Sequence, residues 1–396
     1  MPATYEFWLS DDAGRRFDLL ENLAFASYTR AVAGLGTIQF GLPFKGFASL
    51  YNPYYKPDWR VEVWRSPAYG VPMRNEDVFF LRKPQIYTRV EDGMDMIVFY
   101  GRNGIDLLKR RCVIQLPGTS YTEKTDLLDD MMKEIVREQM LYGSALDETG
   151  AVDNTRAWPE DEFSVQGDTS QGESVTRAFE GRPVYDVLKD LKNISFQLNL
   201  SDPDVERIYF DVAPVWLQSS TAAQSWEFRT YANLRGSDRS NGIEFSMENE
   251  NIKSPEYSIS HLDEVNSVIV KGNGRGISQL SQIVTDDVRA SASRWNKVEK
   301  VIAAANETSS TGLSDAGYAE LGKGRPKEEL NVTFMNTEGG PETPRSLYGL
   351  DWDLGDKVRV NVAQKQFYAE IGVVYVAVDD SGKETITARN VVNEQL

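Results

Sequence analysis

The hydrophobic residues of the first hundred positions recur in short alternating or continuous runs separated by turn residues, a pattern that predicts β-strands. Residues 11–14 separate the first two runs and predict a hairpin, and Asp92 with Gly93 predicts a two-residue hairpin turn. The expected strands cover residues 5–9, 17–20, 24–32, 37–42, 59–64, 78–87 and 96–100. This density of strands fits a small barrel or sandwich.

The period then changes to that of a helix. Ser120 and Glu123 have the spacing of a capping box, and Gly143 provides a stop signal. One helical face would carry Leu127, Leu128, Met131, Ile135 and Val136. Such a stripe fits a buried core face better than a contact with a membrane or partner. Residues 147–174 are acidic and poor in large apolar groups, which predicts an exposed loop or linker.

The middle of the chain is expected to be mixed α/β, and the C-terminal part returns to β structure. A short helix is predicted over 184–191 and another over 315–321, with strands over 208–212, 226–231, 243–247 and 265–270. Thr285 or Asp286 is a candidate cap for a further helix, whose shared face would hold Val288, Ala292, Trp295, Val298 and Ile302. The last expected strands are 330–334, 358–362, 371–378 and 384–388, the last two joined by a hairpin turn at 379–382.

The two β-rich ends share a weak internal sequence similarity. Residues 58–64 and residues 356–362 each place an aspartate before an alternating strand. Two related barrels, one near each end of the chain, would account for this similarity.

Composition narrows the class of protein. The 396 residues carry a formal net charge of -17, which disfavours tight binding to nucleic acid because phosphate affinity comes from Lys and Arg. Cys112 is the only cysteine, so no internal disulfide is expected. The N-terminal residues show no signal-peptide pattern, and no apolar run approaches the roughly 20 residues of a membrane span. We therefore expect synthesis in the cytoplasm and no stable membrane insertion.

The sequence provides no recognisable catalytic or cofactor motif. His261 is the only histidine, which excludes a metal site with several imidazoles, and we interpret both His261 and Cys112 as structural or edge residues. Gly272, Gly274 and Gly276 do not complete a phosphate-binding pattern, because Ile277 stands where a dinucleotide motif needs glycine. The aspartates at 351, 353 and 356 lack the spacing of a calcium-binding loop. We expect no enzyme activity, no cofactor and no metal.

From about residue 184 to the C-terminus, an ordered series of motifs resembles the family of siphophage virion proteins that form the hub of the tail tip or baseplate. The motifs occupy residues 226–231, 236–240, 264–276, 293–299 and 348–358, and residues 101–108 match more loosely as the end of a first barrel. The positions that mark the resemblance are Asn266, Gly272, Gly274, Gly276, Trp295, Asp351, Trp352, Gly355 and Asp356.

The resemblance implies a mainly β fold with α/β parts, similar to the spike-base hub of contractile tails. Two small tube-type β-barrel domains would occupy residues 1–117 and residues 256–284 with 330–396. An outer α/β domain would occupy 118–255, including the acidic loop 147–174, and a helical insertion would occupy 285–329.

The implied function is that of a homotrimeric hub at the tail tip of the virion, which joins the six-fold tail tube to a three-fold tip and lines the DNA channel. The implied partners are further copies of the chain, the distal tail protein, the tape-measure protein and tail fibre or spike proteins, with transient, non-specific passage of DNA. Many relatives carry a peptidoglycan hydrolase after the hub. This sequence ends soon after the last predicted hairpin, so wall cleavage is not carried over.

Two other functions remain open at this stage. A receptor- or carbohydrate-binding module of the same particle is suggested by aromatic residues expected in loops, namely Tyr51, Tyr54, Tyr55 and Trp158. A wall-degrading enzyme is suggested only by the abundance of carboxylates.

Overall fold

The computed structural model describes residues 3–44, 56–90, 93–114, 122–179, 181–216, 224–274, 276–304, 310–341 and 343–390. The chain divides into two compact units. Of the described residues, unit 1 holds 3–196, 205–254 and 332–390, and unit 2 holds 197–204 and 255–331. The chain leaves unit 1 within strand β14 (Ile252–Ser260) and returns within strand β18 (Lys327–Met335), and these two strands pair.

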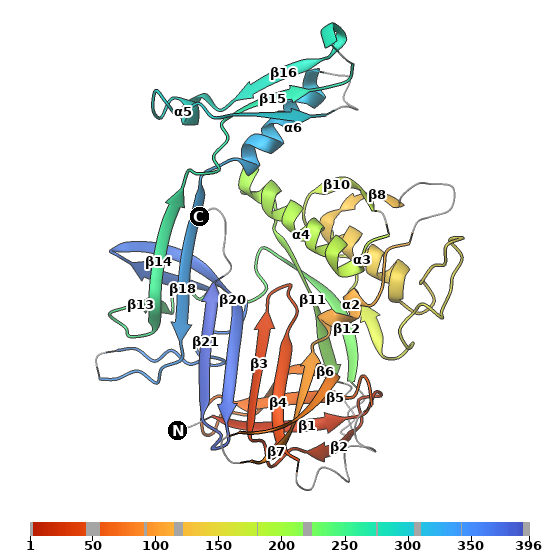
Figure 1. Cartoon of the computed structure of the whole chain (residues 1–396), viewed down its shortest axis with the longest axis vertical. Helices are drawn as coiled ribbons and strands as arrows, with labels where there is room; N and C mark the ends of the chain where they lie inside the picture. The colour runs from red at the N-terminus through yellow and green to blue at the C-terminus, as the bar shows by residue number, and fades with distance from the viewer. Residues whose placement is uncertain are drawn as a thin grey trace. The chain divides into compact units, whose positions relative to one another are not determined.

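One sheet of 13 strands dominates the fold (Figure 1). Its main path runs β14-β18-β21-β20-β3-β4-β7-β6-β5-β1-β2, while β19 pairs with β20 and β13 pairs with β19. Besides β14 and β18, the strands are β1 (Thr4–Ser10), β2 (Arg16–Leu19), β3 (Phe25–Ala31), β4 (Thr37–Pro43), β5 (Arg60–Ser66), β6 (Arg74–Thr88), β7 (Asp95–Arg102), β13 (Glu244–Ser246), β19 (Lys357–Val362), β20 (Lys365–Asp379) and β21 (Glu384–Asn390). The strands predicted in the first hundred residues and in the C-terminal part are therefore confirmed, as are the hairpins at 11–14 and 379–382. Asp92 of the predicted two-residue turn lies outside the described residues.

The sheet is continuous because a C-terminal strand pairs with an N-terminal one. β20 lies antiparallel to β3 over seven registered pairs, from Val373 opposite Ala31 to Asp379 opposite Phe25. Alternate residues of both strands, such as Val376 and Tyr28, are buried. Among the described residues this sheet is open rather than closed on itself, so two separate barrels remain a prediction.

The described residues of unit 1 between β7 and β13 are mixed α/β. The predicted outer domain 118–255 stays a prediction, since β13 and the start of β14 belong to the large sheet. This α/β region contains two small sheets, with strand orders β10-β8 and β11-β12-β9, in which β9 runs parallel to β12. The elements are α2 (Ile105–Lys109), β8 (Thr122–Leu127), α3 (Leu128–Met140), β9 (Phe163–Val165), β10 (Ser174–Phe179), α4 (Val184–Ser201), β11 (Ile208–Trp216) and β12 (Gln224–Ala232). The predicted apolar face of α3 is fully buried at Leu128, Met131, Ile135 and Val136.

Two predictions in this region are wrong in detail. Glu123 does not cap a helix, because it lies in β8 opposite Ala178 of β10, and α3 begins after Leu127. The acidic segment 147–174 is not a free linker. Its Phe163 is buried, and the backbone N–H groups of Thr169 and Ser170 donate to the carboxylate of Asp130. The first turn of α3 thus anchors the loop.

Unit 2 is built on a three-stranded sheet with the order β16-β15-β17. β15 (Ser267–Lys271) pairs antiparallel with β16 (Ser281–Thr285) and parallel with β17 (Glu299–Ala303). Its helical elements are the 3₁₀ turn η1 (Gly276–Ser278), α5 (Asp287–Ala290) and α6 (Ser310–Lys323). The core consists of Val268 and Val270 from β15, Val284 from β16, and Leu313 and Leu321 from α6.

Unit 2 corrects two further expectations. The helix predicted from Asp286 to Ile302 ends at Ala290, although Asp286 does cap it by accepting a hydrogen bond from the backbone N–H of Arg289. Residues 299–303 instead form β17, which pairs in parallel with β15. A helix of this length without a packed apolar face is not stable in water, so the pairing with the sheet prevails. Residues 256–284, expected in the second barrel, place β15 and β16 in this separate sheet instead.

Replacing Gly104 with alanine should destabilise unit 1. A Cβ at this position would lie 2.5 Å from Cζ3 of buried Trp226 and 2.5 Å from the carbonyl oxygen of Val212. We expect a loss of about 1–3 kcal/mol in unfolding free energy, measured by urea titration, because the packed strand cannot move aside. The Gly167→Ala control, where a Cβ meets nothing within 4 Å, should unfold like the wild type. Equal losses in both variants would contradict this account.

Candidate functional site

The C-terminal motif predicted to mark a hub lies in the loop between β18 and β19, in unit 1. Trp352 is 1% exposed, and its ring packs 5.1 Å from Tyr348 and 6.1 Å from Phe245, measured between ring centroids. Asp356 is also buried, and its Oδ1 and Oδ2 accept hydrogen bonds from the backbone N–H groups of Ser237 and Asp353, respectively, at 2.7 and 2.8 Å. The carboxylate therefore orders two loops at once.

The structure brings two of the predicted motifs together at this carboxylate. The backbone N–H of Gly236 donates to the carbonyl oxygen of Gly355 at 3.0 Å. A Cβ on Gly236 would lie 2.4 Å from Oδ1 of Asp356, so only glycine permits this approach. Asp351 lies at the surface, where it forms an ion pair with Arg345 at 2.7 Å. Three of the four marker residues in this loop, Trp352, Gly355 and Asp356, are thus structural.

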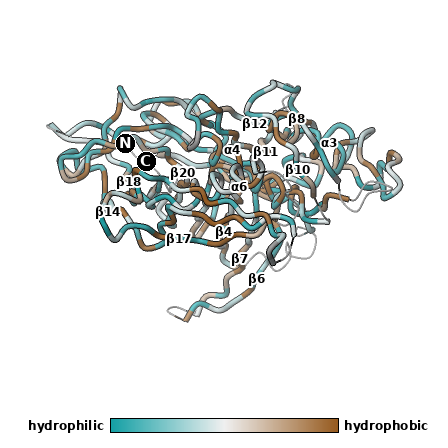
Figure 2. The backbone as a smooth tube through the Cα atoms, turned by 90° about the horizontal axis from the view of Figure 1, so that it is seen from above, coloured by the Kyte–Doolittle hydropathy of each residue, from teal (hydrophilic) through white to brown (hydrophobic). Residues whose placement is uncertain are grey.

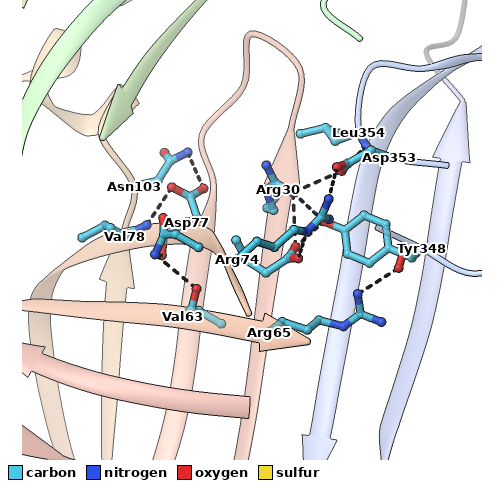
Figure 3. Close-up of polar contacts among 12 residues, drawn as sticks. Arg30, Val63, Arg65, Arg74, Asp77, Val78, Asn103, Tyr348, Asp353 and Leu354 are labelled. Carbon is cyan, nitrogen blue, oxygen red and sulfur yellow. Dashed lines mark hydrogen bonds and ion pairs between the residues drawn. The ribbon is translucent and has the colours of Figure 1, made fainter. Parts of the chain in front are cut away.

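Beneath this loop lies a buried ion pair that joins the two ends of the chain. Arg65 of β5 has a fully buried side chain, and its Nε and Nη2 donate to the two carboxylate oxygens of Glu384 in β21 at 2.8 Å each. Its Nη1 donates to the backbone carbonyl of Tyr348 at 2.9 Å (Figure 3). Burial alone would lower the pKa of Arg65, but Glu384 and Tyr5 raise it above its ordinary value. The guanidinium stays charged and bidentate.

A second group of charges lies beside this pair, and we call the two together the ion-pair cluster (Figure 3). Arg74 donates to Glu76 at 2.8 Å and to Asp353 at 2.7 Å. Arg30 of β3 donates to the hydroxyl of Tyr348, which donates in turn to the fully buried carboxylate of Glu76. N-terminal strands thereby hold the C-terminal loop through charge-assisted hydrogen bonds.

The protonation states in the cluster are fixed at neutral pH. Burial raises the pKa of Tyr348 well above its ordinary value, so the phenol remains a donor. Burial would raise the pKa of Asp353 as well, but Arg30 and Arg74 outweigh that effect and hold it below its ordinary value. The arrangement therefore supports a fixed clamp rather than proton transfer.

A polar cavity of about 200 Å³ adjoins the cluster and is lined by Arg30, Glu76, Asp77, Asp211 and Arg235 among other residues. Burial, together with the charge of Asp211, raises the pKa of Asp77 to about 6, although Arg30 opposes the shift. Oδ1 of Asp77 accepts from the backbone N–H of Val78, and Oδ2 accepts from the amide of Asn103 (Figure 3). The pKa of this carboxylate therefore lies within the range in which a pH change near neutrality alters its charge.

The remaining predicted motif residues lie in unit 2. Asn266 is fully buried, with Oδ1 accepting from the backbone N–H of Val298 at 2.8 Å and Nδ2 donating to the carbonyl of Asn296. This fixes the loop that carries Trp295, whose side chain is 86% exposed. Gly274 and Gly276 have positive φ angles of 101° and 58° and shape the turn after β15, as expected from a glycine-rich turn.

Residues considered for chemistry have structural surroundings. Nδ1 of His261 lies 2.8 Å from Glu264, and Cys112 is a free, exposed residue at an isolated bridge with Pro183. Among the described residues, no group of three or more His, Cys, Asp or Glu side chains could hold a metal ion. In the same residues, no helix has both the length and the apolarity to cross a membrane.

Of the four aromatic residues that suggested carbohydrate binding, the structure describes only Trp158. Tyr51, Tyr54 and Tyr55 lie outside the described residues. Trp158 is half-buried, and the guanidinium carbon of Arg111 lies 3.9 Å from its ring centroid. One face of that ring is therefore already covered by a cation–π contact.

Sequence reasoning missed the ion-pair cluster. Its partners, such as Arg65 and Glu384, stand 319 residues apart, so no local spacing links them. The only available signal was the presence of charged residues inside strands whose neighbours are apolar, as at Arg65 in residues 60–66.

Comparison with protein families matches residues 76–389 to the model described as Siphovirus ReqiPepy6 Gp37-like protein, which spans more than half of the chain. This chain belongs to the Gp37-like family. No curated protein sequence matches it. Membership confirms the predicted resemblance to siphophage tail proteins.

Solved structures share the fold of this Gp37-like protein at low sequence identity. The 43 kDa tail protein of prophage MuSo2 from Shewanella oneidensis superposes with a TM-score of 0.53 at 13% identity, over 99% of each chain. The tail protein from Neisseria meningitidis MC58 gives 0.51 at 10% identity, over 98% of this chain and 96% of that one. A chain of the lidded Francisella PdpA-VgrG complex gives 0.50 at 10% identity, over 99% of this chain and 52% of that one. The Gp37-like family and the two tail proteins are structural phage tail proteins rather than enzymes.

Replacing Glu384 with glutamine in this Gp37-like protein should strongly destabilise unit 1. The variant leaves the buried guanidinium of Arg65 without its bidentate carboxylate. We expect a loss of about 3 kcal/mol in unfolding free energy by urea titration. The matched Asp190→Asn variant breaks an exposed pair with Arg182 and should cost less than about 0.5 kcal/mol. A cost at Glu384 no larger than at Asp190 would show that the cluster is not a clamp.

The raised pKa of Asp77 predicts a pH dependence of stability. A carboxylate with a higher pKa in the folded state binds more protons there, so its contribution is fully favourable below about pH 4 and is lost as pH rises through about 6. Above about pH 6, the free energy of unfolding should have fallen by an amount that approaches about 3 kcal/mol. Unfolding titrations between pH 4 and 7.5 should show this fall in the wild type and a flatter profile in Asp77→Asn. Parallel profiles would refute the assignment.

Proposed function

We propose that this chain is the homotrimeric hub of the phage tail tip or baseplate, which joins the six-fold tail tube to a three-fold tip and lines the DNA channel. Each chain supplies two small tube-type barrels, so three copies form a ring of six. The neighbouring components are the distal tail protein, the tape-measure protein and fibre or spike proteins. The role is assembly and conduit formation.

The observation that carries this proposal is the pairing of β20 with β3, which places both β-rich ends of the chain in one sheet. A chain that offers two similar β surfaces to a ring needs them at a fixed spacing. The ion-pair cluster meets this need, because Arg65 and Glu384 tie the same two ends through side chains. The match in fold to tail proteins over nearly the whole chain agrees with this role.

Exposed apolar side chains on the β6–β7 hairpin support association with further copies. The register of the two strands shifts between Leu81 and Lys83, and β7 stays paired with β4 as far as Met96 opposite Pro43. The β6–β7 hairpin extends outward in Figure 2. Ile86 and Tyr87 are 47% and 38% exposed, and Val90 and Met94 are exposed as well. Apolar groups gathered on such an element fit a contact with another protein.

The charge of the chain fits passage of DNA rather than its capture. A formal net charge of -17 repels phosphates, so an inner wall that shares this acidic character lets the duplex slide without counterion-driven binding.

Native mass spectrometry of the purified chain should show a species of three times 44.6 kDa, either alone or after addition of tail-tip components. In a closed ring, every copy buries its apolar hairpin against a neighbouring copy. This favours a defined trimer over open-ended aggregates. Val90→Asp on the hairpin should shift the equilibrium toward monomer without changing the unfolding free energy. A stable monomer that never joins tails would overturn the hub proposal, and host-cell binding by that monomer would favour a receptor-binding module instead.

A further inference from the structure

The exposed face of the large sheet carries an open groove of about 730 Å³. The groove crosses β20, β3, β4, β7 and β6, which lie side by side in unit 1 (Figure 1). Side chains that are paired across neighbouring strands point to the same face of a sheet. One such row consists of Tyr375, Thr29, Thr37 and Arg102, and the next consists of Ser27, Gln39, Tyr100 and Lys83. The alternate residues Tyr28 and Phe40 are buried on the opposite face, in the core.

The charge of this groove is opposite in sign to that of the whole chain. Its charged lining residues are Arg82, Lys83 and Arg102, and no Asp or Glu of the described residues lines it. The whole sequence, by contrast, holds 60 acidic and 43 basic residues. Most of the other lining side chains are hydroxyl or amide groups, which donate hydrogen bonds without adding negative charge. They are Ser27, Thr29, Thr37, Gln39, Tyr100 and Tyr375.

Ion pairs beside the groove do not neutralise its arginines. Arg82 contacts Asp58 at 2.6 Å, and Arg102 contacts Asp106 at 3.1 Å. Arg110 contacts the same two carboxylates at 2.8 and 2.7 Å, so three guanidinium groups share two carboxylates. The side chains of Arg82 and Arg102 remain 41% and 52% exposed. One positive charge is therefore left over, and both arginines can still reach a ligand in the groove.

Lys83 adds a second positive charge. It is exposed, and no carboxylate pairs with it in the described part of the chain. Its Nζ lies 5.0 Å from the ring centroid of Tyr100, the residue opposite it in the register. The ring holds the ammonium group over the groove without cancelling its charge.

We propose that this groove contacts the phosphate backbone of double-stranded DNA. Arg, Lys, Ser, Thr, Gln and Tyr side chains are the groups that hold phosphate oxygens at protein–DNA contacts, and together they make up most of the lining. The inference rests on the proposed hub function, because the duplex is the polyanion that the channel carries. The contact is independent of base sequence. The net charge of -17 keeps it weak, so the groove guides the duplex without capturing it.

The test is fluorescence anisotropy of a short labelled duplex, titrated with the purified full chain at low salt. Anisotropy should rise saturably, and the logarithm of the binding constant should fall with the logarithm of salt concentration with a slope of about -3 for three phosphate contacts. Lys83→Glu should weaken binding about tenfold and make the slope shallower by about one. Lys83→Arg, which keeps the charge, should bind like the wild type.

A matched control separates the groove from the net charge of the chain. Lys189→Glu makes the same change of charge on exposed α4, outside the groove, and should change the affinity less than about twofold. Equal losses in Lys83→Glu and Lys189→Glu would refute the site. Urea titration should show that both variants unfold like the wild type.

The remaining outcomes separate this inference from the hub proposal and from another ligand. Trimers in native mass spectrometry that give no saturable DNA binding would overturn the groove and leave the hub standing. A chain that stays monomeric and binds DNA with the expected loss in Lys83→Glu would support the groove and contradict the hub. Tighter binding of poly-glutamate than of the duplex would assign the groove to an acidic polypeptide and overturn the inference.

Discussion

The fold of unit 1 depends on the requirement that the buried guanidinium of Arg65 meet a carboxylate. A charge without a partner in this position would cost several kcal/mol, and Glu384, near the far end of the chain, supplies both oxygens. The pair therefore specifies which terminal strands lie near each other, in addition to the backbone pairing of β20 with β3. Apolar packing alone would tolerate other arrangements, because it is not directional.

The same requirement explains why the C-terminal motif is rigid. The backbone carbonyl oxygen of Tyr348 accepts a hydrogen bond from Arg65. Its hydroxyl accepts one from Arg30 and donates one to Glu76. Asp356, a few residues on, orders the loop that carries Gly236. These contacts hold charges rather than move protons, which agrees with a family of structural tail proteins.

Two of the cavities in the described part of unit 1 differ in what surrounds them. The one beside the ion-pair cluster is lined by charged groups that already satisfy one another, with Asp77 as its titrating member. The other is the open groove on the large sheet, where the charged lining residues among those described are all cations and the other side chains are mainly hydroxyl and amide groups.

The sequence by itself determined the mainly β class, nearly every strand, the α3 face and the absence of a recognisable catalytic motif, because these features depend on periodicity and residue type over short distances. Tertiary structure decided the rest. Residues 291–303 have a helical pattern, yet Val301 and its neighbours form β17 because β15 offers a parallel partner. The pairing of Arg65 with Glu384, and of Asp356 with the Gly236 loop, joins residues more than a hundred positions apart. No local sequence pattern encodes such contacts. They depend on which polar groups still lack a hydrogen-bond or ion-pair partner after the strands have formed.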